Sequence, residues 1–360
     1  MNQHTALRPQ RGVTLIELMV TMAITMFLVA AAAYVYLGTR ETQRAIDRNS
    51  SNNETGSFAM QLIGEEIMKA GYYPANTSRV LTDDERYPKL SYYPPTKLAE
   101  NSAQATDWTP PTSATVDVYL SGLFGCDSSK FLPAAGKCGD VIKAGDPDSI
   151  VINYFTNDNL GTNVGDRRDC TGADVALDPS NTKRLNDTNT AAPPLQPLFV
   201  SNRFGINATS TEIDKQTVST LSLACNGNGI ATATDSYQPL LPGIEDIRFT
   251  YGVFAVTKDT GSRTPEKFYT ATEVSGLNPV NVDNGMLVAS MPPWSRVSAV
   301  RVCIMVKSQG GNPRISDKVG SERTYADCRG NTPTQDASDH SLHKKFEQVF
   351  VLRNRMSVVY

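Results

Sequence analysis

Histidine is scarce in this chain, and the short motifs that mark common enzyme classes are missing from it. The sequence has 360 residues with three histidines and no C-x-x-C, G-x-S-x-G, Walker A or G-x-G-x-x-G motif. A zinc ribbon, a thioredoxin-type site, a serine hydrolase and a nucleotide-binding loop are therefore not indicated. His340 and His343 lie beside two lysines, which predicts a solvated basic patch. Ser341-x-x-Lys344 lacks its companion motifs and is attributed to chance.

An excess of charge of either sign is also missing. There are 34 basic and 37 acidic residues, with a formal net charge of −3. Direct binding to nucleic acid is not predicted, because that function prefers a strongly basic face. The chain contains 40% hydrophobic and 20% charged residues, as expected of a globular protein. Its length predicts about two domains or one elaborated domain.

Aspartates cluster in two loops, and calcium is the metal that such loops would hold. The two groups are Asp146/Asp148 and Asp166/Asp169/Asp174. Neither has the spacing of an EF-hand, and ordinary polar surface loops look the same. The prediction is no metal and no cofactor, with calcium as a minor alternative.

A long apolar run lies near the N-terminus. Leu18 to Leu37 spans twenty residues, of which only Thr21 and Thr25 are mildly polar. A helix of this length spans about 30 Å, the thickness of a bilayer core. Arg8 and Arg11 precede the run, so we expect the N-terminus inside and the bulk of the chain outside. A cleaved secretory signal is the alternative, but the run exceeds a signal h-region and no A-x-A site ends it.

Glu17 does not suit a plain membrane anchor. A carboxylate at a helix centre costs about 2.5–3.5 kcal/mol on insertion, and less near the end. No cation lies between Val13 and Leu37 to neutralise it. Cleavage after Gly12 would make Glu17 the fifth residue and create an amine that a neighbouring chain's Glu17 could pair with. The alternative is a carboxylate solvated at the lipid headgroups.

The residues Arg11 to Val20 (RGVTLIELMV) resemble the class III signal of type IV prepilins and pseudopilins. The resemblance implies cleavage by prepilin peptidase after Gly12 and N-methylation of Val13. It also implies that Glu17 guides docking of the subunit into a filament. The usual first mature residue of this family is Phe, whereas here it is Val13.

The rest of the chain predicts an α+β fold in which one long N-terminal helix packs on an antiparallel β-sheet head with large loop insertions. The helix should weaken or kink at 49–57 and stop at Gly71 and Pro74, with one apolar stripe for the core. That stripe contains Ala59, Ile63, Ile67 and Ala70. The predicted strands are Thr115–Leu120, Ser149–Phe155, Thr217–Cys225, 247–253, 300–306 and Lys345–Leu352, with loops at 76–114, 157–196, 257–284 and 308–340.

The head also resembles the PilW branch of minor pilins. The similar stretches are Phe58 to Tyr72, Leu241 to Val253, Trp294 to Lys307 and the C-terminal FEQVFVLRNRM. The resemblance implies four parts: a leader over 1–12, a membrane and filament-core helix over 13–37, its amphipathic continuation over 38–73, and a periplasmic head over 74–360.

As function, the resemblance implies a non-enzymatic minor pilin that primes pilus assembly in a tip complex and so supports twitching, adhesion or DNA uptake. The protein would cross the inner membrane once and then enter the pilus. Its partners would be prepilin peptidase, other minor pilins, the major pilin, the inner-membrane assembly platform and a tip adhesin. The alternatives are a J-type minor pseudopilin of type II secretion and, in another class, a membrane-anchored periplasmic enzyme or binding protein.

Six cysteines follow the apolar run, an even number that suits an oxidising periplasm. Fifteen pairings are possible. The nearest two, Cys126 and Cys138, would close a loop of about 13 residues, worth roughly 3 kcal/mol in the chain-entropy model. The remaining candidates are Cys170 with Cys225 and Cys303 with Cys328. Unpaired buried thiols are the alternative.

Overall fold

The computed structural model divides into two compact units, Met1–Ser51 and Asn52–Tyr360, which are described separately. The leader, Gly12, Val13 and the predicted strand Thr115–Leu120 lie outside the described residues. Those residues are 14–72, 122–133, 137–141, 143, 145–155, 168–173, 199–213, 216–229, 236–255, 263–283, 288–291, 293–308, 323–335 and 341–353.

The N-terminal element is one helix, α1 (Leu15–Lys69). It ends as predicted at Gly71, whose φ of 70° lies in the left-handed region that glycine adopts without steric cost. The Gly71 amide then donates to the carbonyl of Asn153 at 2.9 Å, which ties the helix end to a strand of the head. A residue with a side chain at this turn would strain the backbone.

The predicted kink at 49–57 is wrong, because α1 is continuous through this segment. Its poor helix formers are used for packing. The Asn52 side chain donates to the Leu342 carbonyl at 3.3 Å, and the Asn53 side chain accepts from Lys344. A Cβ on Gly56 would lie 2.2 Å from the Phe346 ring, so glycine permits the close approach. Tertiary contacts therefore outweigh intrinsic propensity here.

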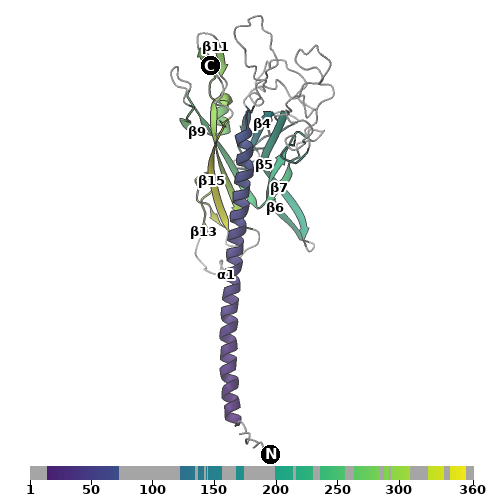
Figure 1. The fold of residues 1–360 in the computed structure, drawn as a ribbon, viewed down its shortest axis with the longest axis vertical. Coiled ribbons are helices and arrows are strands. Elements are labelled where there is room, and N and C mark those ends of the chain that lie inside the picture. Colours follow the sequence, from purple (N-terminus) through teal and green to yellow (C-terminus); the bar gives the residue numbers. More distant parts are fainter. Residues whose placement is uncertain are drawn as a thin grey trace, which may run out of the picture. The chain divides into compact units, whose positions relative to one another are not determined.

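The head contains a five-stranded and a four-stranded sheet, both antiparallel (Figure 1). The first has the order β1-β4-β5-β6-β7, and the second has the order β15-β12-β8-β9. The strands of the first are β1 (Leu123–Cys126), β4 (Ser149–Phe155), β5 (Phe199–Ile213), β6 (Gln216–Asn226) and β7 (Gln238–Pro242). Those of the second are β8 (Ile244–Val253), β9 (Lys267–Tyr269), β12 (Val297–Lys307) and β15 (His343–Val351).

The predicted antiparallel β-sheet head is divided between these two main sheets, and the division falls at Gly243. Pro242 ends β7 and cannot donate to a further strand. Gly243 has a φ of 86° and redirects the chain so that β8 pairs with β12. Its amide donates to Leu221 at 2.9 Å and its carbonyl accepts from Lys307 at 2.8 Å, so one residue bonds to both sheets.

Short elements occupy two segments that were predicted to be loops. Within 257–284 lie β9 and α3 (Ala271–Ser275), whose N-terminus has a capping box between Thr270 and Glu273. β10 (Val280–Asp283) lies in the same segment, and β13 (Arg323–Thr324) and β14 (Thr334–Gln335) lie within 308–340. The remaining short elements, outside both segments, are β2 (Phe131–Leu132), β3 (Lys137–Cys138), β11 (Val288–Met291) and the 3₁₀ helix η3 (Pro293–Arg296).

The predicted helix stripe is confirmed as core. Ala59, Ile63 and Ile67 are fully buried and belong to one apolar cluster with residues of both sheets. Trp294 lies in the same cluster, with its ring 4.9 Å from that of Tyr251 in an edge-on arrangement. The stripe thus holds the head to the second half of α1.

Three disulfides cross-link the head, with Cα–Cα distances of 5.6, 6.3 and 5.7 Å. They join Cys126 to Cys138, Cys170 to Cys225, and Cys303 to Cys328, which are the pairs named from the sequence. All six cysteines are paired.

Candidate functional site

The first turn of α1 is closed by a reciprocal pair, Thr14 and Glu17. The Thr14 amide and hydroxyl each donate to the Glu17 carboxylate at 3.4 Å, and the Thr14 hydroxyl accepts from the Glu17 amide at 3.4 Å. This is the geometry of a capping box, which satisfies helix-end donors. The carboxylate also lies at the positive end of the helix dipole. The sequence prediction missed this capping role, although T-x-x-E before an apolar run is its usual signature.

The surface of α1 from Leu18 to Leu37 is apolar on all sides. Its most apolar 18-residue window has a mean hydropathy of 2.2, and none of that window is buried. The hydroxyls of Thr21 and Thr25 donate to carbonyls one turn back, to Leu18 at 2.9 Å and to Thr21 at 2.6 Å. They therefore need no outside partner. Length and composition suffice to cross a membrane.

Glu17 is then the one charged side chain between Leu15 and Thr39. It is solvent-exposed, and its bonds to Thr14 leave room on the carboxylate for a further donor. A helix that is apolar on every face is stable only when lipid or other helices cover it. Glu17 is thus an exposed carboxylate at the start of an apolar helix segment.

Other side chains considered from the sequence have structural contacts. His343 is buried, lies 2.9 Å from Glu245 and stacks on the Tyr325 ring, so the predicted solvated patch is wrong at this residue. Tyr325 follows directly after β13. His340, Asp166 and Asp174 lie outside the described residues.

The Asp169 carboxylate accepts backbone amides from Thr171, Ala173 and Gly229. Both oxygens of this carboxylate therefore already accept hydrogen bonds from backbone amides of the surrounding loops. In the described ranges, no three His, Cys, Asp or Glu side chains gather closely enough to hold a metal ion.

Comparison with known families gives two matches. The prokaryotic N-terminal methylation motif matches residues 7–33, which include Gly12, Val13 and Glu17. The family described as type IV pilus-assembly protein W, PilW, matches residues 211–354, from β5 to the end of β15. The head of this chain is therefore similar to the PilW family of type IV pilus-assembly proteins, and its N-terminus is similar to the methylation motif of prepilins.

A solved type IV-like pilin from Thermus thermophilus is also similar to this chain. It is 12% identical, with a TM-score of 0.27, and the match covers 59% of this chain and 81% of that one. A search of curated proteins gave no significant match. The family points to a structural protein rather than an enzyme.

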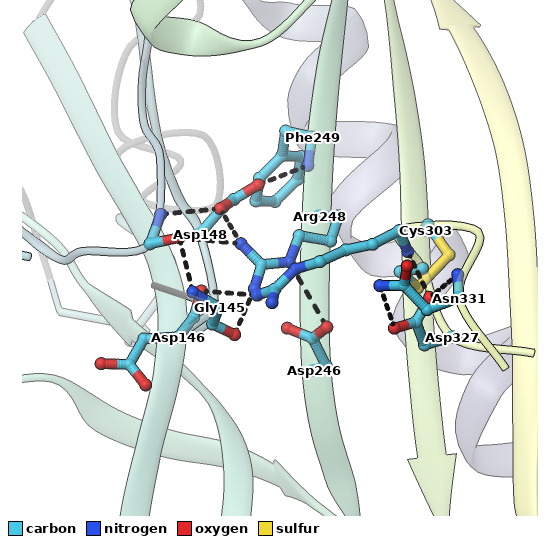
Figure 2. Close-up of polar contacts among 12 residues, drawn as sticks. Gly145, Asp146, Asp148, Asp246, Arg248, Phe249, Cys303, Asp327 and Asn331 are labelled. Atoms are coloured by element: carbon cyan, nitrogen blue, oxygen red, sulfur yellow. Dashed lines mark hydrogen bonds and ion pairs between the residues drawn. A yellow bond between two sulfur atoms is a disulfide. The ribbon is translucent and has the colours of Figure 1, made fainter. Parts of the chain in front are cut away.

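A buried ionic cluster lies in the head. Arg248 on β8 bonds to the Asp148 carboxylate and the Gly145 carbonyl, and it bonds to Asp246 at 3.4 Å and the Ser128 hydroxyl at 3.3 Å (Figure 2). The guanidinium side chain is 11% exposed. The cluster joins the segment before β4 to β8 and so connects the two sheets.

The sequence did not reveal this cluster. In the strand predicted over 247–253, Ile247 and Phe249 alternate with Arg248, which is typical of a strand with only one covered face. In the structure, Ser128 from the loop closed by Cys126–Cys138, together with Gly145 and Asp148, covers Arg248. The weak local signal was Asp146-Pro-Asp148, an acidic pair directly before a fully buried strand.

Burial destabilises the charged form of both carboxyl groups in the cluster, Asp148 and Asp246. Burial raises the pKa of Asp148 to about 6, although Arg248 and the amides of Ser128 and Phe249 oppose the rise. Burial also raises the pKa of Asp246 to about 6, with Arg248 again opposing it. One Asp246 oxygen is buried without a hydrogen-bond partner. One guanidinium thus serves two buried carboxyls.

These shifts predict that the head is more stable at pH 5 than at pH 7. Because the folded pKa of both carboxyls lies above the ordinary 3.8, the folded state binds more protons than the unfolded state between these values. The free energy of unfolding is therefore higher at low pH and falls as the pH rises through about 6. The expected gain in unfolding free energy from pH 7 to pH 5 is about 1–3 kcal/mol. Urea unfolding followed by tryptophan fluorescence measures it.

Asp246→Asn should remove part of this pH dependence, because it replaces one of the two titrating carboxyls. Asp140→Asn, at an exposed position, is the control and should keep the wild-type slope. If the free energy of unfolding depends equally on pH in the wild type, Asp246→Asn and Asp140→Asn, Asp246 is not a source of the pH dependence.

Proposed function

We propose that this protein is a minor pilin that primes assembly of a type IV pilus, within a complex of minor pilins at the tip. The observation that carries the proposal is the apolar α1 surface with its single carboxylate at the first turn. The methylation motif over 7–33 and the PilW match over 211–354 support it.

Processing and topology follow from the same residues. Arg8 and Arg11 keep the leader in the cytoplasm, and the head lies in the periplasm, where its three disulfides are stable. Prepilin peptidase cleaves between Gly12 and Val13, and the new amine of Val13 is methylated. The four parts are then the leader 1–12, the membrane helix 13–37, its continuation 38–73 and the head 74–360.

Docking uses the charge of Glu17. In a low-dielectric medium a carboxylate is stabilised strongly by a cation at short range. The amine of a neighbouring pilin provides that cation without adding a charged side chain to the membrane. The apolar surface of α1 exchanges lipid for other pilin helices as the subunit moves into the filament. The partners are other minor pilins, the major pilin, the assembly platform and a tip adhesin.

Intact-mass measurement of the membrane-extracted chain tests the processing step. Coexpression with prepilin peptidase should remove residues 1–12 and add the mass of one methyl group to Val13. Gly12→Val is the control and should keep the full mass, because a branched side chain replaces the small residue at the cleavage site. A wild-type chain that still begins at Met1 beside an active peptidase would contradict the proposal.

A further inference from the structure

The end of the apolar run in α1 is marked by two tyrosines and then by arginines. Tyr34 and Tyr36 are 82% and 65% exposed, and Leu37 is the last residue of the run. Arg40 and Arg44 follow, both exposed on the same continuous helix. Tyrosine is enriched where a membrane-spanning helix leaves the hydrocarbon core, because its ring is apolar and its hydroxyl is polar. The order of these residues therefore places both arginines just beyond the hydrocarbon boundary.

Helix geometry gives the depth of each arginine. A helix rises 1.5 Å per residue, so Arg40 lies about 4.5 Å and Arg44 about 10 Å beyond Leu37 along the axis. The headgroup zone of one leaflet is about 5–7 Å thick. Side chains in a helix tilt toward its N-terminus, which here is the direction of the bilayer. Both guanidinium groups therefore reach lipid phosphates, Arg40 directly and Arg44 by extending its long side chain back.

Tyr36, Arg40 and Arg44 also share one face of the helix. Their spacing is i, i+4 and i+8, which places them within about 80° of one another around the axis. Within the ranges that the structure describes, no residue forms a hydrogen bond or ion pair with either guanidinium group. The two arginines are therefore available to a ligand from outside the chain.

The charges of this segment favour an anionic ligand. The ionisable residues from 38 to 51 are three basic and two acidic ones, namely Arg40, Arg44, Arg48, Glu41 and Asp47. Glu41 follows Arg40 directly and so lies about 100° around the helix axis, and Asp47 lies about 10 Å further from the bilayer than Arg40. The face nearest the headgroups is therefore basic, and a guanidinium group binds two phosphate oxygens at once.

Anionic groups at this depth come from phospholipids or from an acidic side chain on another pilin helix. A pilin helix reaches this face only during assembly, whereas lipid surrounds it from the moment that α1 enters the membrane. The Tyr36 ring, one turn below Arg40, also suits the boundary between acyl chains and headgroups. A phospholipid is therefore the better match.

We propose that Tyr36, Arg40 and Arg44 bind the headgroup of an anionic phospholipid in the leaflet next to the head. The tyrosine ring lies at the top of the acyl chains, and the two guanidinium groups hold the phosphate. The bound lipid fixes the depth of α1 and retains the subunit in the membrane until it is transferred to the filament. This rests on the proposed membrane anchoring of α1, but not on leader cleavage or on Glu17.

Reconstitution of the full chain in nanodiscs tests the proposal. The discs contain equal amounts of phosphatidylglycerol and phosphatidylcholine, and native mass spectrometry of the released protein gives the ratio of the two retained lipids. The wild type should retain phosphatidylglycerol in about fivefold excess or more. An excess of inorganic phosphate should not lower this ratio, because the lipid is also held by its acyl chains.

Matched arginine exchanges locate the binding. Arg40→Gln should lower the excess of phosphatidylglycerol by about fivefold. Arg48→Gln makes the same exchange about 16 Å beyond Leu37, where salt screens the attraction to the headgroups, and should change the excess by less than about twofold. Glutamine keeps a helix propensity close to that of arginine, and circular dichroism checks that both variants fold.

Four results would overturn the proposal. The first is a wild type without an excess of phosphatidylglycerol, and the second is an equal effect of Arg40→Gln and Arg48→Gln, because net charge alone would then explain the preference. The third is a loss of pili in Arg40→Gln with an unchanged lipid ratio, since a pilin helix would then be the partner. The fourth is a chain that does not enter the nanodiscs, which would also remove the membrane anchoring.

Discussion

Exchanging Glu17 for glutamine should leave a processed, membrane-held protein that no longer supports pilus assembly. Glutamine at the third helical position retains the capping box with Thr14, so the helix start is preserved. Only the negative charge is removed, and with it the attraction to a neighbour's amine. We expect at least about tenfold fewer surface pili, counted by electron microscopy, for a loss of about 1.4 kcal/mol or more in docking.

Two control variants separate docking from helix capping. Thr14→Ala removes the cap but keeps the charge, and it should retain most piliation at a helix cost of about 1 kcal/mol. Glu54→Gln makes the same chemical exchange at an exposed position further along α1 and should pass as wild type. Wild-type piliation in Glu17→Gln would exclude the docking role, while a defect confined to Thr14→Ala would assign the pair to capping alone.

Replacing Arg248 with methionine should produce the largest loss of stability in the head. Methionine retains much of the side-chain volume but leaves Asp148 and Asp246 without their buried cation. Removing one partner of a buried ion pair costs about 3–5 kcal/mol. Urea unfolding of the full chain at pH 7, followed by the fluorescence of tryptophans that include the buried Trp294, measures the change.

The companion variants test the physical cause. Arg301→Met, on neighbouring β12, loses an exposed ion pair and should cost about 1 kcal/mol or less. Combining Arg248→Met with Asp148→Asn and Asp246→Asn should recover part of the loss, because no unpaired charge remains buried. Lowering the pH to 5 should also reduce the loss. Stability of Arg248→Met equal to wild type at pH 7 would mean that the cluster does not hold the sheets together.

The sequence reveals the parts of this protein whose evidence is local. Glu17 stands out because it is charged within an apolar run, and Ala59, Ile63 and Ile67 repeat at helical spacing. β4 and β12 are rich in β-branched residues and were found within a few residues of their bounds. β5 was missed, because its sequence is polar and only Val200, Phe204 and Ile206 mark its buried face.

Features that depend on distant partners could not be predicted in this way. Gly56 and Asn52 favour a helix break until Phe346 and Leu342 are placed against them, almost 300 residues later. The division into two sheets depends on the backbone of Gly243 bonding in both directions. Arg248 and Asp148 are 100 residues apart, and no motif links them.

The placement of the disulfides has a mechanical consequence. Cys126–Cys138 and Cys170–Cys225 involve the strands and loops of the five-stranded sheet, and Cys303–Cys328 ties a loop to β12 of the other. None of the three crosses from one sheet to the other. The seam between the two sheets is held instead by apolar packing, by backbone hydrogen bonds such as those of Gly243 and Asp148, and by the Arg248 cluster. Under a pulling load we therefore expect the head to yield first along that seam, where no disulfide links the two sheets.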